Sequence, residues 1–153
     1  MKKTVSIIFC TLLVLLMLSA CGDSGVYRVA VDMSFSPFCS VDSEGNAIGF
    51  EVDLMNAIAK DKGFKVEYYP VGYPEALEEL ESGEYDIAMA AIIPTEELSL
   101  KFDFTDMYYN SEYAIAVERG KNSEFIELFN EGLSEIKSNG KYKEIYSNYF
   151  ASK

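Results

Sequence analysis

Histidine and tryptophan are both absent from this 153-residue sequence, and the missing histidine restricts the chemistry most. Histidine is the commonest general base and the commonest transition-metal ligand in proteins. Its absence excludes a Ser-His-Asp triad, a Cys-His pair and a His-rich zinc site. The sequence also has no glycine-rich phosphate loop and no Cys-x-x-Cys pair. We therefore predict no catalytic residues, no metal and no cofactor, and we do not expect an enzyme.

Basic side chains are scarce, with 13 lysines and arginines against 25 acidic residues and a formal net charge of −12. Such a surface repels nucleic acid and anionic lipid, so we expect no nucleic-acid partner. The charge favours solubility. It also favours neutral or cationic ligands, although net charge alone discriminates weakly between partners.

A long apolar run is also missing, because the stretch over 7–18 is too short to span a membrane. It follows Lys2 and Lys3 and ends in small residues, which is the pattern of a secretory signal peptide. Leu18-Ser19-Ala20-Cys21 resembles the end of a bacterial lipoprotein signal. The alternative is an ordinary cleaved signal followed by a chance cysteine.

The lipoprotein resemblance implies that residues 1–20 form the signal peptide and that Cys21 carries lipid. Residues 21–25 then tether the protein to the bacterial cell membrane on its extracytoplasmic side. Two or more acyl chains hold a protein stably at a membrane. Among the three cysteines, Cys39 is then left without a partner, so the mature chain contains no disulfide. We expect Cys39 to be a small apolar side chain in a strand, and a reactive thiol is the minority alternative.

The remaining residues, 26–153, are enough for one domain with a real core and too few for two. Strand-like and helix-like segments alternate along them, which predicts an α/β fold: a three-layer αβα single lobe with a mainly parallel sheet of about five strands. The expected strands are 27–33, 65–69, 87–93, 102–104 and 113–117. The expected helices are 51–62, 74–82, 123–139 and 141–149, and a short hairpin is expected around 42–46.

Ligands of parallel α/β sheets bind beyond the carboxyl ends of the strands. Three segments occupy such ends here: 32–35 with Asp32 and Phe35, 71–73 with Tyr73, and Ala91-Ile92. An acid and two aromatic side chains would therefore converge on one crevice. The alternative is that the aromatic side chains belong to the core.

Five motifs, distributed along nearly all of 27–150, resemble a known family. They are Val29–Phe38, Gly49–Leu54, Gly83–Ile87, Phe104–Tyr109 and Gly140–Phe150. Together they resemble the family 3 extracellular solute-binding proteins, the polar amino-acid receptors of ATP-driven (ABC) importers. The resemblance implies a periplasmic-binding-protein type II fold and an ABC importer permease as partner.

The sequence departs from this family where the second lobe is normally inserted. Tyr108-Tyr109 runs through three residues directly into Tyr113, the start of a segment that resembles the family's return strand. The resemblance therefore implies that only the first lobe is present, with the second lobe absent.

The second departure lies in the ligand site. The family places an arginine that grips the α-carboxylate of the ligand, and the matching position here is Leu98. Lys101, one turn further on, is a poor substitute for a bidentate guanidinium group. Asp32, Phe35 and Tyr73 do align with positions that contact the ligand side chain. With Ala91 and Thr95 they form the candidate ligand-binding set.

We therefore predict a solute-binding lipoprotein related to amino-acid ABC importers, with an altered or degenerate site for a small polar or cationic solute. The alternative is an interaction module that no longer binds solutes. We also consider a homodimer, or capture of another partner, through apolar side chains left at the open edge. These side chains are Phe35, Tyr73, Ile92, Ile93, Tyr108 and Tyr109. The alternative is a monomer whose aromatic side chains fold inward into the core.

Overall fold

The computed structural model describes residues 25–151 of the chain. The predicted signal peptide, Cys21 and most of the tether lie outside the described residues. Among the helices in 25–151, none combines the length and the apolar character that a membrane span requires.

A five-stranded sheet forms the centre of the fold, in the order β5-β1-β6-β8-β7. Strand β1 (Val26–Asp32) pairs in parallel with β5 (Lys65–Val71) and with β6 (Ile87–Ile92). Strand β8 (Ala114–Glu118) runs antiparallel to both β6 and β7 (Phe102–Phe104). Four strands therefore share one direction and only β8 opposes them, so the predicted mainly parallel sheet is confirmed.

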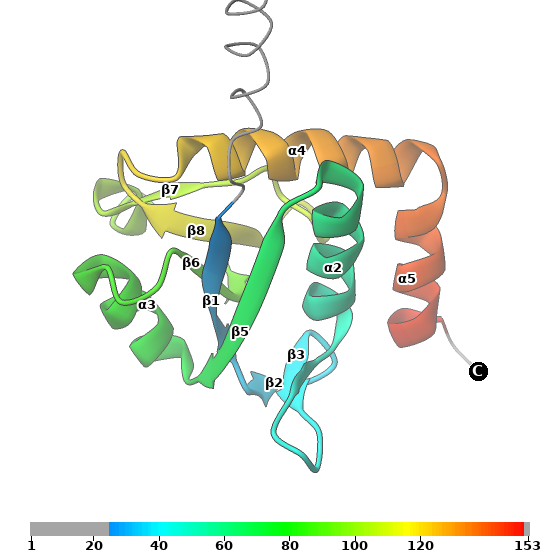
Figure 1. The fold of residues 1–153 in the computed structure, drawn as a ribbon, viewed down its shortest axis with the longest axis horizontal. Coiled ribbons are helices and arrows are strands. Elements are labelled where there is room, and N and C mark those ends of the chain that lie inside the picture. The colour runs from blue at the N-terminus through cyan, green and yellow to red at the C-terminus, as the bar shows by residue number, and fades with distance from the viewer. Residues whose placement is uncertain (1–24, 152–153) are drawn as a thin grey trace, which may run out of the picture.

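Helices cover both faces of the sheet (Figure 1). Helix α3 (Tyr73–Ser82) covers one face, and the short 3-10 helix η2 (Leu98–Leu100) contacts β7 at its edge. The other face carries α2, α4 and α5. Their bounds are Phe50–Lys62, Ser123–Ser138 and Lys141–Phe150. The three-layer αβα single lobe is thus confirmed.

Side chains alternate between these two faces along each central strand, as strand geometry requires. In β1, Val29 and Val31 join the cluster under α2, α4 and α5, while Ala30 faces α3. In β6, Met89 joins the cluster under α2, α4 and α5, while Ala88 faces α3. Both faces are buried, which explains the continuous apolar run that predicted this strand.

A small three-stranded sheet lies at the lower end of β1 and β5 in Figure 1. Its strands are β2 (Ser34–Phe35), β3 (Cys39–Val41) and β4 (Ala47–Ile48), and the predicted hairpin joins the last two. Cys39 is fully buried, and burial raises the pKa of its thiol to about 12. Its predicted role as a small apolar side chain in a strand is confirmed.

A tight turn joins β7 to β8 at the position where the family inserts its second lobe. Asn110 and Ser111 both have positive φ angles, of 42° and 58°. The Glu112 N–H donates to the Tyr109 carbonyl at 2.9 Å, and Tyr109 and Tyr113 form an antiparallel bridge. The bridged pair encloses three residues, the first two of them left-handed, so the chain reverses direction here without any inserted element.

Candidate functional site

The carboxyl ends of β1 and β6 meet the start of α3 at one pocket of about 260 Å³. Four of the five predicted site residues line it: Asp32, Phe35, Tyr73 and Ala91. Ala90, Ile93 and Tyr113 complete the lining, and none of the lining residues is basic. The pocket is slightly smaller than the usual range for small-molecule sites, which begins at about 300 Å³.

Asp32 ends β1 and supplies the negative charge of the pocket. Its side chain is nearly buried, with 6% of the residue exposed. Oδ1 accepts hydrogen bonds from the backbone N–H of Ser34 at 2.9 Å and from its hydroxyl at 2.7 Å. Oδ2 accepts no hydrogen bond from the described residues. One oxygen therefore fixes the following turn, and the other is available to a ligand.

Aromatic and apolar side chains form the rim. Phe35 is 42% exposed, Tyr73 37% and Ile93 53%. The Phe35 ring stacks on Phe38, with 5.3 Å between the ring centroids, and meets Tyr113 edge-on. A pocket that a carboxylate and aromatic side chains line together is suited to a cationic group, through charge attraction and cation–π contact.

Tyr113 was missed as a site residue because it precedes a strand and does not follow one. Strand β8 runs antiparallel to β6, so its beginning lies at the edge where the parallel strands end. The sequence indicated a strand at this position but did not indicate its direction. A short connection from Tyr109 was the one signal that favoured an antiparallel partner.

Thr95, the fifth predicted site residue, does not line this pocket. Its Oγ1 accepts the backbone N–H of Leu98 at 3.1 Å, and its side chain is exposed at the start of η2. A hydroxyl in this position is favoured for local backbone bonding. Thr95 therefore orders the turn after β6.

Leu98 and Lys101 are also directed elsewhere. Both line a separate groove beside α3, where Leu98 packs against the α3-side core. The Lys101 ammonium group pairs with Glu81 at 2.8 Å. The only two arginines of the chain are engaged as well: Arg28 pairs with Asp86, and Arg119 donates to the Ser99 carbonyl. No basic group among the described residues replaces the expected carboxylate clamp.

The open edge is less apolar than predicted. Tyr108 and Ile92 are buried, with 1% and 0% exposed, so these two expectations are wrong. Tyr108 packs against Phe50. Ile92 faces α3 because strand alternation turns it away from Ala91. Tyr109 is half-buried.

A buried acid lies directly behind the pocket. Glu51, in the first turn of α2, is 1% exposed. Its Oε1 accepts the backbone N–H of Ala91 at 2.9 Å and the hydroxyl of Tyr108. The sequence motif contained this residue, but an acid in a first helical turn ordinarily faces solvent and complements the helix dipole. Only the tertiary structure, in which Glu51 bonds to Ala91 of β6, reveals its burial.

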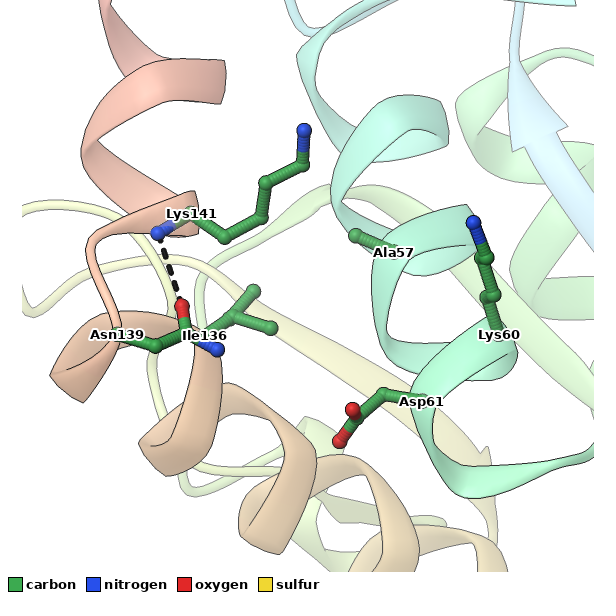
Figure 2. Close-up of a pocket in the computed structure, with 6 residues that line it drawn as sticks. All are labelled: Ala57, Lys60, Asp61, Ile136, Asn139 and Lys141. Carbon is green, nitrogen blue, oxygen red and sulfur yellow. Dashed lines mark hydrogen bonds between the residues drawn. The ribbon is translucent and has the colours of Figure 1, made fainter.

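A second pocket, of about 320 Å³, opens where α2, α4 and α5 meet (Figure 2). Figure 2 shows Lys60 and Lys141 extending outward on either side of Ala57, while Asp61 comes from the end of α2. No buried polar group is directed into this pocket, so it is the weaker candidate. Within residues 25–151, no group of three acidic, cysteine or histidine side chains is arranged to hold a metal ion.

Comparison with known proteins matches residues 27–152 to the bacterial extracellular solute-binding proteins, family 3. The chain is 39% identical over 118 residues to a probable histidine-binding protein from Neisseria gonorrhoeae, covering 69% of this chain and 44% of that protein. It is 34% identical over 70 residues to cyclohexadienyl dehydratase from Pseudomonas aeruginosa, covering 46% and 26%. The chain thus spans less than half the length of either relative.

Among solved structures, substrate binding domain 2 of GlnP from Lactococcus lactis, in its open conformation, superposes with a TM-score of 0.81. The alignment covers 88% of this chain and 99% of that one at 22% identity. This identity is low enough that the similarity speaks for the fold alone.

Proposed function

Because the chain belongs to the bacterial extracellular solute-binding proteins of family 3, we propose that it binds a small cationic solute in the pocket of Asp32, Phe35, Tyr73 and Ala91. One observation carries this proposal: a nearly buried carboxylate, one oxygen of which accepts no hydrogen bond from the described residues, lines the same pocket as aromatic side chains, with no basic residue in the lining. The histidine-binding name of one relative is in keeping with a cationic ligand.

The ligand is expected to lack an α-carboxylate. Neither arginine lies at the pocket, and Leu98 faces a different groove. A guanidinium–carboxylate pair is bidentate and has no simple substitute. An amino-acid carboxylate would instead meet Asp32 in a space without compensating charge. We therefore propose an altered site that selects amines or guanidines over amino acids.

Agmatine and L-arginine form a matched pair of probes, because they differ only in the α-carboxylate. Calorimetry of the purified protein is expected to show agmatine binding more tightly than L-arginine. Asp32→Asn should abolish agmatine binding, while Glu96→Gln, a change of the same chemistry at an exposed position, should preserve it. Micromolar binding of L-arginine, or unchanged agmatine affinity in Asp32→Asn, would contradict the proposal.

Anchoring and partners form the second part of the proposal. Cys21 carries lipid, the folded lobe lies outside the cytoplasmic membrane, and an ABC importer permease receives the ligand. Family membership supports extracellular solute binding in the service of an importer. Mass spectrometry of the membrane fraction tests the anchor: the wild-type chain should carry acyl mass on Cys21, and Cys21→Ser should lose both this mass and the membrane association.

An interaction module is the alternative, favoured by exposed apolar side chains. Met33, Phe35, Ile93 and Met107 are each more than 40% exposed. Exposed apolar patches on monomers commonly mark contact sites. Under this alternative the protein forms a homodimer that Ile93→Ser dissociates, measured by sedimentation velocity, and agmatine does not bind. A monomer at all concentrations would rule it out.

Catalysis is not part of the proposal, although one relative is a dehydratase. The chain has no histidine, and Asp32 is the only carboxylic acid in the pocket lining. The pocket therefore lacks the commonest general base and a second carboxylate to pair with Asp32.

A further inference from the structure

Glu51 is a buried acid whose hydrogen bonds are only half satisfied. Its Oε1 accepts two hydrogen bonds, from the Ala91 N–H and the Tyr108 hydroxyl, while Oε2 is buried without a partner. Leaving a buried carboxylate oxygen unpaired is costly, more so for a charged group than for a neutral one. A proton bound to Oε2 would remove that charge. This feature is unusual enough to require a role.

The hydrogen bond to Ala91 connects Glu51 to the wall of the pocket. Ala91 lines the pocket and has a φ angle of 46°, in the left-handed region that residues with a Cβ seldom adopt. The pairing of β6 with β8 is irregular between Ala88 and Ile92, at the same place. Such a backbone conformation persists only where surrounding contacts hold it. Glu51 supplies the contact to its N–H.

The groups that face Glu51 are acidic or neutral. Asp32 approaches from β1, Cys39 from β3 and Tyr108 from the segment before β8, with Tyr113 behind it. No basic side chain among the described residues is part of this group. Burial raises the pKa of Glu51 to about 7, with a further increase from the Asp32 charge, while the two hydrogen bonds oppose the rise. Burial likewise raises the pKa of Tyr108, so its hydroxyl keeps the proton that it donates.

We propose that Glu51 is a positioning residue that makes the shape and charge of the Asp32 pocket sensitive to protons. In its ionised form, Glu51 holds the Ala91 amide firmly and adds a negative charge behind the pocket. When a proton from solvent binds Oε2, the hold on Ala91 weakens and this charge disappears. A cation in the pocket therefore favours the ionised form and is bound more tightly at higher pH. The effect on affinity rests on the proposed function, whereas the coupling of Glu51 to Ala91 does not.

Nuclear magnetic resonance of the ligand-free protein tests the coupling directly. The Ala91 amide proton is expected to shift with pH, with a midpoint near 7, because its acceptor gains or loses charge. Glu51→Gln keeps an acceptor oxygen but cannot titrate, so the shift should disappear. Glu96→Gln, at an exposed position, should leave it intact. An Ala91 amide that does not titrate, or that titrates equally in Glu51→Gln, would overturn the proposal.

Tyr108→Phe provides a second variant in case Glu51→Gln does not fold. Removing the hydroxyl deletes a hydrogen bond that favours the ionised form, so the midpoint of the Ala91 titration should move upward. An unchanged or lowered midpoint would count against the proposal. If Glu51 had only a structural role, removing its hydrogen bond to Tyr108 would not change the pH midpoint of the Ala91 amide shift.

Agmatine binding tests the effect on affinity and separates the two proposals. The wild-type protein should bind agmatine more tightly above neutral pH than below it, by up to about tenfold for each unit by which the ligand lowers the pKa of Glu51. In Glu51→Gln this pH dependence should vanish. If agmatine does not bind at any pH while Ala91 titrates, the proposed ligand is wrong and the coupling stands. If agmatine binds with the same pH dependence in both proteins, the role of Glu51 is refuted and the proposed function stands.

Discussion

The two faces of the central sheet share the same strands but are packed with side chains of very different size. Beneath α2, α4 and α5 the core is aromatic, with Phe50, Tyr108, Phe125 and Phe129 almost fully buried. Beneath α3 it consists largely of alanine. The buried alanines there are Ala30, Ala76, Ala88, Ala90 and Ala116.

This difference follows from the number of helices on each face. Three helices leave deep spaces between one another and the sheet, which only large rings fill. A single helix can approach alanine-bearing strands closely and needs little bulk. Close packing of the aromatic face therefore requires large side chains. Close packing of the alanine face requires small ones. The pocket lies at the strand ends where these two faces meet, since Ala90 faces α3 and Ala91 faces the other side.

Removing bulk from the aromatic face should have the largest effect. Phe50 is fully buried and contacts seven other aromatic rings. Phe50→Ala is expected to lower the free energy of unfolding by about 3–5 kcal/mol, because it removes these contacts and leaves a cavity. Urea unfolding followed by circular dichroism measures this loss.

Leu100→Ala is the control for that substitution, because Leu100 is 73% exposed. Its effect should stay within about 0.5 kcal/mol. A Phe50→Ala variant as stable as Leu100→Ala would mean that the aromatic face does not dominate stability.

The buried acid beneath the aromatic face should give the next largest effect. Glu51 binds its proton more tightly in the folded state, with a pKa of about 7 against an ordinary value of 4.5. The contribution of protonated Glu51 to the free energy of unfolding is therefore largest at low pH and is lost as the pH rises from 4.5 to 7. Relative to Glu51→Gln, the wild-type protein should lose about 2–3 kcal/mol of unfolding free energy between about pH 5 and pH 8. Parallel pH profiles of the two proteins would contradict this.

Adding bulk to the alanine face should destabilise by a smaller amount. Ala88 is fully buried in the middle of β6, between Ala30 and Ala116 on the neighbouring strands. Ala88→Val is expected to cost about 1–3 kcal/mol, because α3 must move away from the sheet to admit two methyl groups. Ala57→Val, at a half-buried position of α2, is the matched control. Thermal unfolding should give Ala88→Val a clearly lower melting temperature than Ala57→Val.

The ion pairs on the two faces should have the smallest effects. Lys62 links α2 to α4 through Glu135 at 2.6 Å, and its side chain is 13% exposed. Lys101 pairs with Glu81 on the α3 side, and both side chains are about half exposed. Exposed pairs contribute little and are screened by salt. Lys62→Ala should lower the melting temperature more than Lys101→Ala. Added salt should reduce the difference between the two variants. A larger loss in Lys101→Ala would contradict this prediction.

Much of the candidate site was predictable because it follows from strand direction. Asp32 and Ala91 end parallel strands, and Tyr73 follows one, so their meeting required only the parallel order of β1, β5 and β6. Thr95 lies outside the pocket, and its hydroxyl accepts a backbone N–H of the turn that follows β6, a local contact that the family resemblance does not report. Tyr113 was missed because its strand runs in the opposite direction.

The sequence by itself determined the elements of the central sheet, their alternation and, to within two residues, the strand ends, because these depend on local periodicity and on short-range turn chemistry. The lack of histidine likewise rules out histidine-dependent triads and zinc sites within these 153 residues, without reference to the fold. Only the tertiary structure decided that Glu51 is buried and that its carboxylate holds Ala91. These two residues lie 40 positions apart, and burial is a property of what packs around a side chain, which no local pattern contains.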